Sequence, residues 1–140
     1  MVCMVRMLRN RAGSSAVEFA IIAPIFLLVL LTMIAYGIYL MTAYSVQQVA
    51  ADAARTAVAG LSNNERETLA KDFVSRSALG YAFMDKRYFH VTVGSDLSNT
   101  NQFTVTVEYD ATELPIWSLY SYALPEKTIK RFSTIRIGGV

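Results

Sequence analysis

The sequence predicts an α+β protein. A long N-terminal transmembrane helix continues into a soluble helix, and a second helix packs on a small antiparallel sheet of about three strands. Three observations carry this prediction. Residues 19–41 are 23 consecutive positions without Asp, Glu, Lys or Arg. Apolar residues then recur at spacings of three and four, and from residue 89 the apolar period changes to two.

The charge-free run at residues 19–41 is long enough to cross a bilayer. At a rise of about 1.5 Å per residue, such a helix is about 34 Å long, against a hydrocarbon core of about 30 Å. A cleaved secretory signal fits less well, because its apolar region is usually about 7–15 residues and ends in a polar cleavage region. A lipoprotein is disfavoured because the only cysteine, Cys3, precedes the run. We therefore expect an uncleaved membrane helix.

The flanking charges predict the orientation of this helix. Arg6, Arg9 and Arg11 precede the run, whereas the first charge after it is Asp52. By the positive-inside rule the N-terminus lies in the cytoplasm and residues 42–140 lie across the membrane.

The charges on either side of the apolar run also predict how the chain is divided into segments. It consists of a basic leader (1–13), a transmembrane helix (14–42) and an extracytoplasmic domain with a helix and an antiparallel sheet (43–140). Tyr36, Tyr39 and Tyr44 form either an interfacial aromatic belt or part of the packing.

The charge balance and the residue types exclude several classes of function. Beyond residue 41, ten Lys or Arg balance ten Asp or Glu, so the net charge of +2 belongs mainly to the N-terminus and gives no footprint for nucleic acid. With one Cys and one His, the chain has no zinc spacing and no His-based triad. Phosphate-loop and metalloprotease motifs are also absent from the sequence. We expect no enzyme activity, cofactor, metal site or small-molecule substrate.

Two helical patterns follow the membrane run. The first stripe predicts that the long helix continues to about residue 61, and its residues form either core or a surface for a partner helix: Val46, Val49, Ala50, Ala53, Ala57, Val58 and Leu61. Asn64 and Glu67 have the spacing of a capping box and predict the start of the second helix. Its predicted apolar stripe is Leu69, Ala70, Phe73, Val74, Ala78 and Tyr81.

Alternating apolar residues predict the strands. Phe89, Val91 and Val93 form the first run, and a second run, 103–109, follows a turn-rich stretch of about eight residues. A third antiparallel strand is predicted at 127–137. Residues 111–126 are expected to form an ordered loop or short helix. In this segment Trp117, with Tyr120 and Tyr122, forms either a contact patch or core.

The most specific motif precedes and enters the apolar run. It reads Arg9-Asn-Arg-Ala-Gly13-Ser14-Ser-Ala-Val-Glu18-Phe19 and combines a short basic leader, a glycine, and an acid five positions later. It resembles the processing signal of type IV pilin-like precursors. Gly13-Ser-Ser-Ala-Val-Glu-Phe-Ala-Ile-Ile-Ala-Pro24 and Ala51-Asp-Ala-Ala-Arg55-Thr-Ala are similar to TadE-like minor pseudopilins of the tight-adherence (Flp, Tad) type IVb pilus. Beyond residue 60 the likeness is one of architecture, a pilin-like fold.

The resemblance implies processing by a prepilin peptidase between Gly13 and Ser14, with Arg6, Arg9 and Arg11 as leader charges. A glycine suits a protease site because its backbone extends without hindrance. The resemblance also implies a bacterial inner-membrane location. It further implies a TadV-like peptidase, TadF-like pseudopilins, Flp pilin, the Tad inner-membrane platform and its secretion ATPase as partners. The implied role is in pilus assembly, adhesion and biofilm formation.

Glu18 has two compatible interpretations. Ser15 and Glu18 have capping-box spacing, and an acid in the first turn complements the helix dipole. In a pilus, Glu18 would instead pair with the new amine of a neighbouring subunit at the membrane edge. The alternative for the whole chain is an unprocessed, single-pass scaffold or binding protein of the cell envelope.

Overall fold

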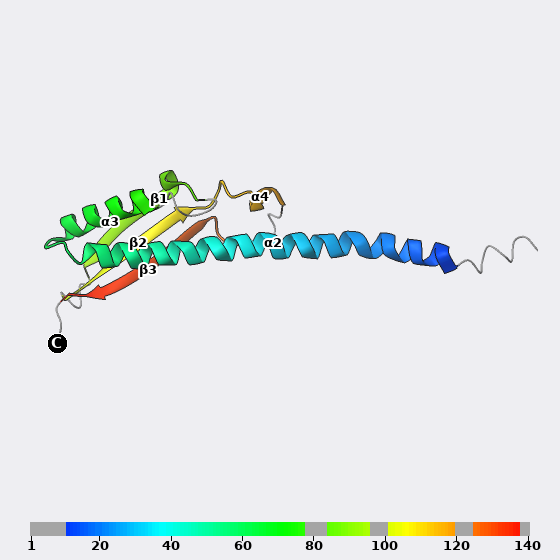
Figure 1. The fold of residues 1–140 in the computed structure, drawn as a ribbon, viewed down its shortest axis with the longest axis horizontal. Helices are drawn as coiled ribbons and strands as arrows, with labels where there is room; N and C mark the ends of the chain where they lie inside the picture. Colours follow the sequence, from blue (N-terminus) through cyan, green and yellow to red (C-terminus); the bar gives the residue numbers. More distant parts are fainter. Residues whose placement is uncertain (1–10, 78–83, 96–100, 120–124, 138–140) are drawn as a thin grey trace, which may run out of the picture.

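The computed structural model describes residues 11–77, 84–95, 101–119 and 125–137, and it confirms the predicted fold class. A long apolar helix runs out of a small domain in which two helices pack on a three-stranded antiparallel sheet (Figure 1). The elements in chain order are α2 (Arg11–Ala57), α3 (Asn63–Ser77), a 3-10 turn (Lys86–Tyr88), β1 (Phe89–Ser95), β2 (Gln102–Asp110), α4 (Ile116–Leu119) and β3 (Thr128–Arg136).

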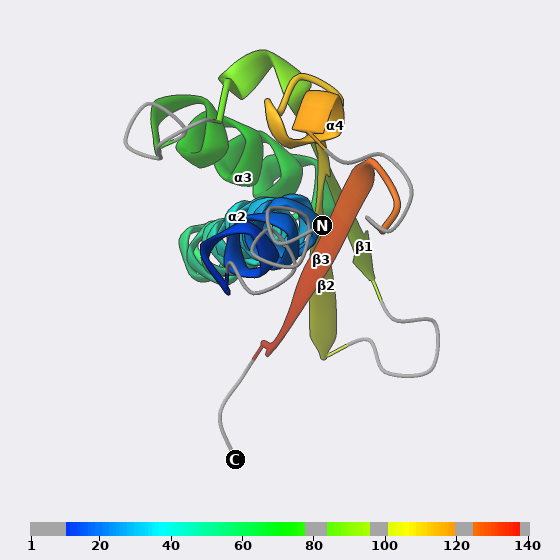
Figure 2. The same cartoon turned by 90° about the vertical axis from the view of Figure 1, so that its right-hand side faces the viewer.

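The sheet has the order β1-β2-β3, so neighbouring strands are also consecutive in sequence. Val91 lies opposite Val107 in the first pair, and Val107 lies opposite Arg131 in the second. Both helices cover the same face: α3 contacts β1, while α2 contacts β2 and β3. Figure 2, which looks along α2, shows the two helices side by side on one side of the strands.

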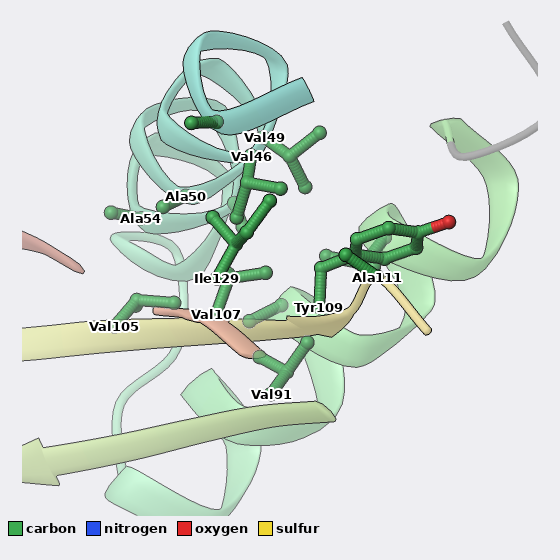
Figure 3. Packing of buried hydrophobic residues seen from close by; sticks show 14 of the residues in the cluster. Val46, Val49, Ala50, Ala54, Val91, Val105, Val107, Tyr109, Ala111 and Ile129 are labelled. Carbon is green, nitrogen blue, oxygen red and sulfur yellow. The ribbon is translucent and has the colours of Figure 1, made fainter. Parts of the chain in front are cut away.

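The period-two pattern predicted which strand residues face the helices. On β2 every second side chain is buried, from Phe103 to Tyr109. Val91 on β1 and Ile129 on β3 are buried on the same face (Figure 3). The opposite face is mostly polar but includes the exposed Phe132, and the hydroxyls of Thr104 and Thr134 lie 2.7 Å apart across β2 and β3.

Small side chains on α2 make close packing on the sheet possible. Ala50, Ala53, Ala54 and Ala57 are completely buried, as are Val46 and Val49. Figure 3 shows several of these side chains directed at Val105, Val107 and Ile129 of the sheet. Because alanine adds little width, the helix axis can approach the strands closely enough for valine and isoleucine to fill the space between them.

The predicted stripe of α2 was wrong at its C-terminal end. Val58 and Leu61 are exposed, and Leu61 is 91% exposed. The helix ends at Ala57, so these two residues no longer follow its periodicity. Ala54, which the prediction omitted, is buried instead.

The capping box of α3 also differs from the predicted one. The Ser62 hydroxyl accepts a hydrogen bond from the Glu65 amide at 3.2 Å, and the Glu65 carboxylate accepts one from the Leu61 amide at 2.9 Å. The box therefore uses Ser62 and Glu65 in place of Asn64 and Glu67, and the helix begins at Asn63. Of the predicted stripe, Ala70 and Val74 are buried, whereas Ala78 and Tyr81 lie outside the described residues.

Candidate functional site

The predicted processing site lies in the first turns of α2. This helix begins at Arg11, so Gly13 and Ser14 are both helical, and Glu18 follows Ser14 by about one turn. Arg6 and Arg9 lie outside the described residues. The structure thus places the leader junction, the candidate scissile bond and Glu18 on one continuous helix.

The position of the helix bears on the capping interpretation of Glu18 in the uncleaved chain. A capping residue flanks the first helical turn, but α2 begins four residues before Ser15. In the uncleaved chain, Ser15 and Glu18 are therefore inside the helix, and its first turn holds no acidic residue. Both residues nevertheless have interaction partners in the structure. The capping interpretation of Glu18 stays a prediction, because it needs a helix that begins close to Ser15.

The helix then projects without cover from the described part of the domain. Between Ser15 and Ile34 no residue is buried, and large apolar side chains such as Phe19, Phe26 and Met33 are exposed. Ser15–Ala57 is the one described helix that is long and apolar enough to cross a membrane, with a mean hydropathy of 2.6 in its most apolar window. The helix continues through Pro24 (Figure 1). These features indicate single-pass membrane anchoring.

The domain begins to cover α2 at Ala35, which is completely buried. Tyr39, one turn later, is also buried, and its hydroxyl lies 3.5 Å from the main-chain oxygen of Glu126, to which it donates. Tyr36 and Tyr44 are exposed. Of the three tyrosines proposed as a belt, Tyr39 therefore belongs to the packing, while the other two lie on the surface of the helix.

The end of the domain nearest the uncovered helix is built by α4 and the start of β3. α4 contacts α2, and Figure 1 shows it at this end of the domain. The half-buried Trp117 donates from Nε1 to the Ala111 oxygen at 2.5 Å, and the Lys127 ammonium lies 5.5 Å from the centre of its ring. The sequence pointed to Trp117 as a contact or core residue. No motif pointed to Lys127 as its neighbour. Tyr120 and Tyr122 lie outside the described residues.

Two exposed carboxylates stabilise turns at this domain. The side-chain hydrogen bond from Arg87 lowers the pKa of Asp85, with the Arg87 amide adding to the effect. The Thr112 hydroxyl and amide lower the pKa of Asp110 in the same way. These are local turn interactions, and they supply no proton donor or acceptor with a pKa near neutrality.

The described part of the chain has few side chains grouped in a way that could bind a metal ion or a ligand. No group of three His, Cys, Asp or Glu side chains there is close enough to hold a metal ion. His90 is exposed on β1, beside an open groove between β1 and α3 that also contains the Glu67–Lys71 ion pair, whose charged atoms are 2.6 Å apart. The expectations of no metal, no cofactor and no catalysis stay predictions.

Comparison with known proteins finds a similarity to one family over part of the chain. Residues 13–55 match the family model described as TadE-like protein. No curated protein and no solved structure matches the chain. The match begins at Gly13 and ends at Arg55 near the end of α2, so it covers the uncovered helix and the part packed on the sheet. The resemblance seen in the opening motif is confirmed over residues 13–55, which are similar to the TadE-like family.

Proposed function

We propose that this protein is a minor pseudopilin, a structural or assembly subunit needed for biogenesis of a Tad (Flp) pilus and for adhesion. It is anchored in the bacterial inner membrane by α2, with the N-terminus in the cytoplasm and the C-terminal domain in the periplasm. One observation carries the proposal. A basic leader ends at Gly13, the apolar helix follows at once, and the TadE-like match begins at the same glycine.

The first event in this function is hydrolysis of the Gly13–Ser14 peptide bond by a prepilin peptidase. Gly13 and Ser14 lie within α2, whereas a protease needs an extended backbone at its cleavage site. The helix must therefore unwind around this bond before it is cleaved. Glycine within a helix costs about 1 kcal/mol relative to alanine. Gly13 therefore favours opening of the helix around the scissile bond.

Cleavage changes the role of Glu18. It removes residues 1–13 with their three arginines, leaves 127 residues, and creates a positively charged amine at Ser14. Ser15 and Glu18 then lie in the first turn of the shortened helix, where an acid complements the helix dipole. No other Asp or Glu precedes Asp52 in the sequence. Glu18 is therefore the acid that we expect to pair with the Ser14 amine of a neighbouring subunit.

The proposal implies a set of partners by family analogy. They are the TadV-like peptidase, TadF-like pseudopilins, Flp pilin, and the inner-membrane platform with its secretion ATPase. The uncovered helix supports membrane-embedded partners, because its exposed apolar side chains from Ser15 to Ile34 face lipid or other helices in a membrane.

The N-terminus of protein recovered from membranes tests this function. Protein from cells with an active prepilin peptidase is expected to begin at Ser14, whereas protein from cells without it begins upstream and is about 1.4 kDa heavier, at roughly 110 Da for each of 13 residues. Full-length protein in both strains would overturn the processing step. It would favour the alternative, an unprocessed envelope scaffold anchored by the same helix.

A further inference from the structure

β1 forms one edge of the sheet, because β2 is its only neighbour in the order β1-β2-β3. An edge strand presents main-chain N–H and C=O groups to which another strand can add. β1 pairs with β2 one residue to one residue from Phe89 to Ser95, so this strand has no bulge, and its sequence has no proline. β1 thus lacks two of the features that usually block such an edge.

The other edge of the sheet, β3, is partly occupied by α2. The main-chain oxygen of Phe132 accepts a hydrogen bond from the Gln47 side chain at 3.2 Å. β3 also carries Lys130, Arg131 and Arg136 and no acidic residue. The two edges therefore differ, and β1 is the one that is more open to a further strand.

A groove of about 360 Å³ lies between α3 and the open edge of β1. The consecutive residues Phe89–Thr92 line it, although neighbouring side chains of a strand point to opposite faces of the sheet. The groove therefore follows the edge of the strand and not one of its faces. The other wall is α3, which is held beside β1 by a hydrogen bond from the Asn63 side-chain amide to the Ser95 hydroxyl.

The side chains of this groove indicate what it can bind. Lys71 and Lys86 line it, and the one carboxylate among the described lining residues, Glu67, already pairs with Lys71 at 2.6 Å. The groove therefore has an excess of positive charge. Val74 and Val91 add apolar surface to it. This combination is complementary to an extended segment that carries both acidic and apolar side chains.

We propose that the groove binds an extended acidic segment of another polypeptide, which adds to the sheet beside β1 as a fourth strand. Main-chain hydrogen bonds to β1 hold the segment. Its acidic side chain contacts Lys86 and its apolar side chain packs on Val74. The site lies on the domain beyond the membrane helix, so binding depends neither on cleavage after Gly13 nor on Glu18.

The direction of the strands disfavours a second copy of this chain as the occupant. Tyr39 of α2 donates a hydrogen bond to Glu126, just before β3. Further along α2, Gln47 contacts Phe132 within β3, so β3 runs in the same direction as α2. β1 has this direction too, since both strands are antiparallel to β2.

Copies anchored in one membrane in the same orientation therefore have β1 strands that all point away from the membrane. Two β1 edges related by a two-fold axis in one continuous sheet are antiparallel, which needs copies of opposite orientation. The β3 edge of a second copy is basic, as the groove is, so charge repulsion opposes that pairing as well.

The test uses the full chain in detergent and a fluorescent synthetic peptide of the length of β1, seven residues. The peptide alternates valine with threonine or glutamate. One matched peptide has lysine in place of glutamate, and another has methyl groups on alternate main-chain nitrogens. We expect the acidic peptide to bind, the lysine peptide to bind about tenfold more weakly, and the methylated peptide not to bind. Fluorescence anisotropy measures the three affinities.

Two further measurements locate the site. The bound acidic peptide is expected to slow amide hydrogen exchange in Phe89–Ser95 and to leave exchange in Thr128–Arg136 unchanged. Lys86→Glu is expected to reverse the preference between the acidic and lysine peptides. Arg136→Glu, the same change of charge on the opposite edge strand, is the matched control and should keep the original preference.

The inference is overturned if none of the peptides binds, or if the methylated peptide binds as tightly as the acidic one, because strand addition needs the main-chain N–H groups. Equal affinities for the acidic and lysine peptides overturn it too. Protection of β1 that grows with protein concentration in the absence of peptide shows that a second copy covers this edge, which also contradicts the proposal. The N-terminus of the mature protein is measured separately, so these outcomes leave the processing step untouched.

Discussion

The side chain of Gln47 on α2 donates a hydrogen bond to the main-chain oxygen of Phe132 on β3, with 3.2 Å between Nε2 and the oxygen. β3 is an edge strand, and edge strands present main-chain groups that other chains can pair with. The contact connects the long helix to the last strand directly, beside the alanine-rich packing. It therefore fixes the position of the edge strand relative to the helix that enters the membrane.

Replacing Gln47 with alanine is expected to lower the free energy of unfolding of the domain by about 1 kcal/mol, the usual net contribution of one such hydrogen bond. Gln48→Ala is the matched control, since Gln48 is exposed on the next position of the same helix. Urea unfolding of the detergent-solubilised chain measures the difference. Equal midpoints for the two variants would contradict a stabilising role for the contact.

Gly13→Leu is expected to block removal of the leader. A leucine side chain crowds the scissile bond and favours the helical conformation that cleavage must open. Immunoblots of membranes should show only the heavier species. Gly37→Leu, an exposed glycine further along the same helix with open space around its Cα, serves as the control and should be processed normally. Normal cleavage of Gly13→Leu would rule out this glycine as the recognition element.

Glu18→Gln separates the two roles of this carboxylate. Glutamine also fits a capping box, so loss of a cap alone leaves behaviour nearly unchanged. Breaking a desolvated charge pair with a neighbouring Ser14 amine costs about 3 kcal/mol, more than a hundredfold in an association constant. We expect normal cleavage but reduced co-purification with pilus partners and fewer pili.

The control for this experiment is Glu113→Gln, which neutralises an exposed carboxylate on the domain. If Glu18→Gln is recovered with its partners as well as Glu113→Gln, Glu18 acts only within its own helix. The cleavage proposal is unaffected by that result, because it depends on Gly13 and the leader.

Gly60→Ala is expected to destabilise the domain because a Cβ at this position has no room. It would lie 2.8 Å from the main-chain nitrogen of Arg66 and 2.8 Å from its Cγ, at the point where α3 begins. Backbone shifts of this kind typically cost about 1–3 kcal/mol. Gly94→Ala on β1 is the control, since nothing lies within 4 Å of its Cβ position. Thermal unfolding should show a lower midpoint only for Gly60→Ala.

Acid is expected to weaken the domain through Asp85 and Asp110. Hydrogen bonds from Arg87 and from Thr112 lower the pKa values of these carboxyls in the folded chain. A carboxyl whose pKa is lower in the folded chain than in the unfolded chain stabilises the fold above the unfolded-state pKa, which is near 4. This stabilisation is lost as the pH falls through the pKa of the folded state. Unfolding midpoints should therefore drop below about pH 4. A combined Asp85→Asn and Asp110→Asn variant should show a shallower drop.

Much of this fold was predictable because each element carries its own periodicity. Phe103 to Tyr109 alternate strictly, and one buried face of a sheet enforces that alternation. The helix boundaries were less predictable. Asn64 and Ser62 are both good capping residues, and the choice between them depends on contacts that only the folded chain has, such as the packing of Arg66 against Gly60.

The membrane-proximal site was predictable in part. The charges of the leader, Gly13 and the apolar run are local features and can be read directly. Which face of α2 the domain covers is not local, because it depends on α4 and β3, which begin at Ile116 and Thr128, far along the chain from the end of α2 at Ala57. Tyr39 could therefore be read equally well as a lipid-facing or a packed residue, and only the fold shows that it is packed.

The pairing of α2 with β3 has a consequence for how the domain is made. α2 is synthesised first and β3 last, yet the buried alanine face of α2 needs Ile129 of β3 to cover it. Until β3 has been made, the packed part of α2 has an open apolar face and β2 has an unpaired edge. A chain that terminates before Thr128 lacks both contacts, so the apolar face of α2 and the edge of β2 stay open. The packing of the helix made first thus depends on the strand made last.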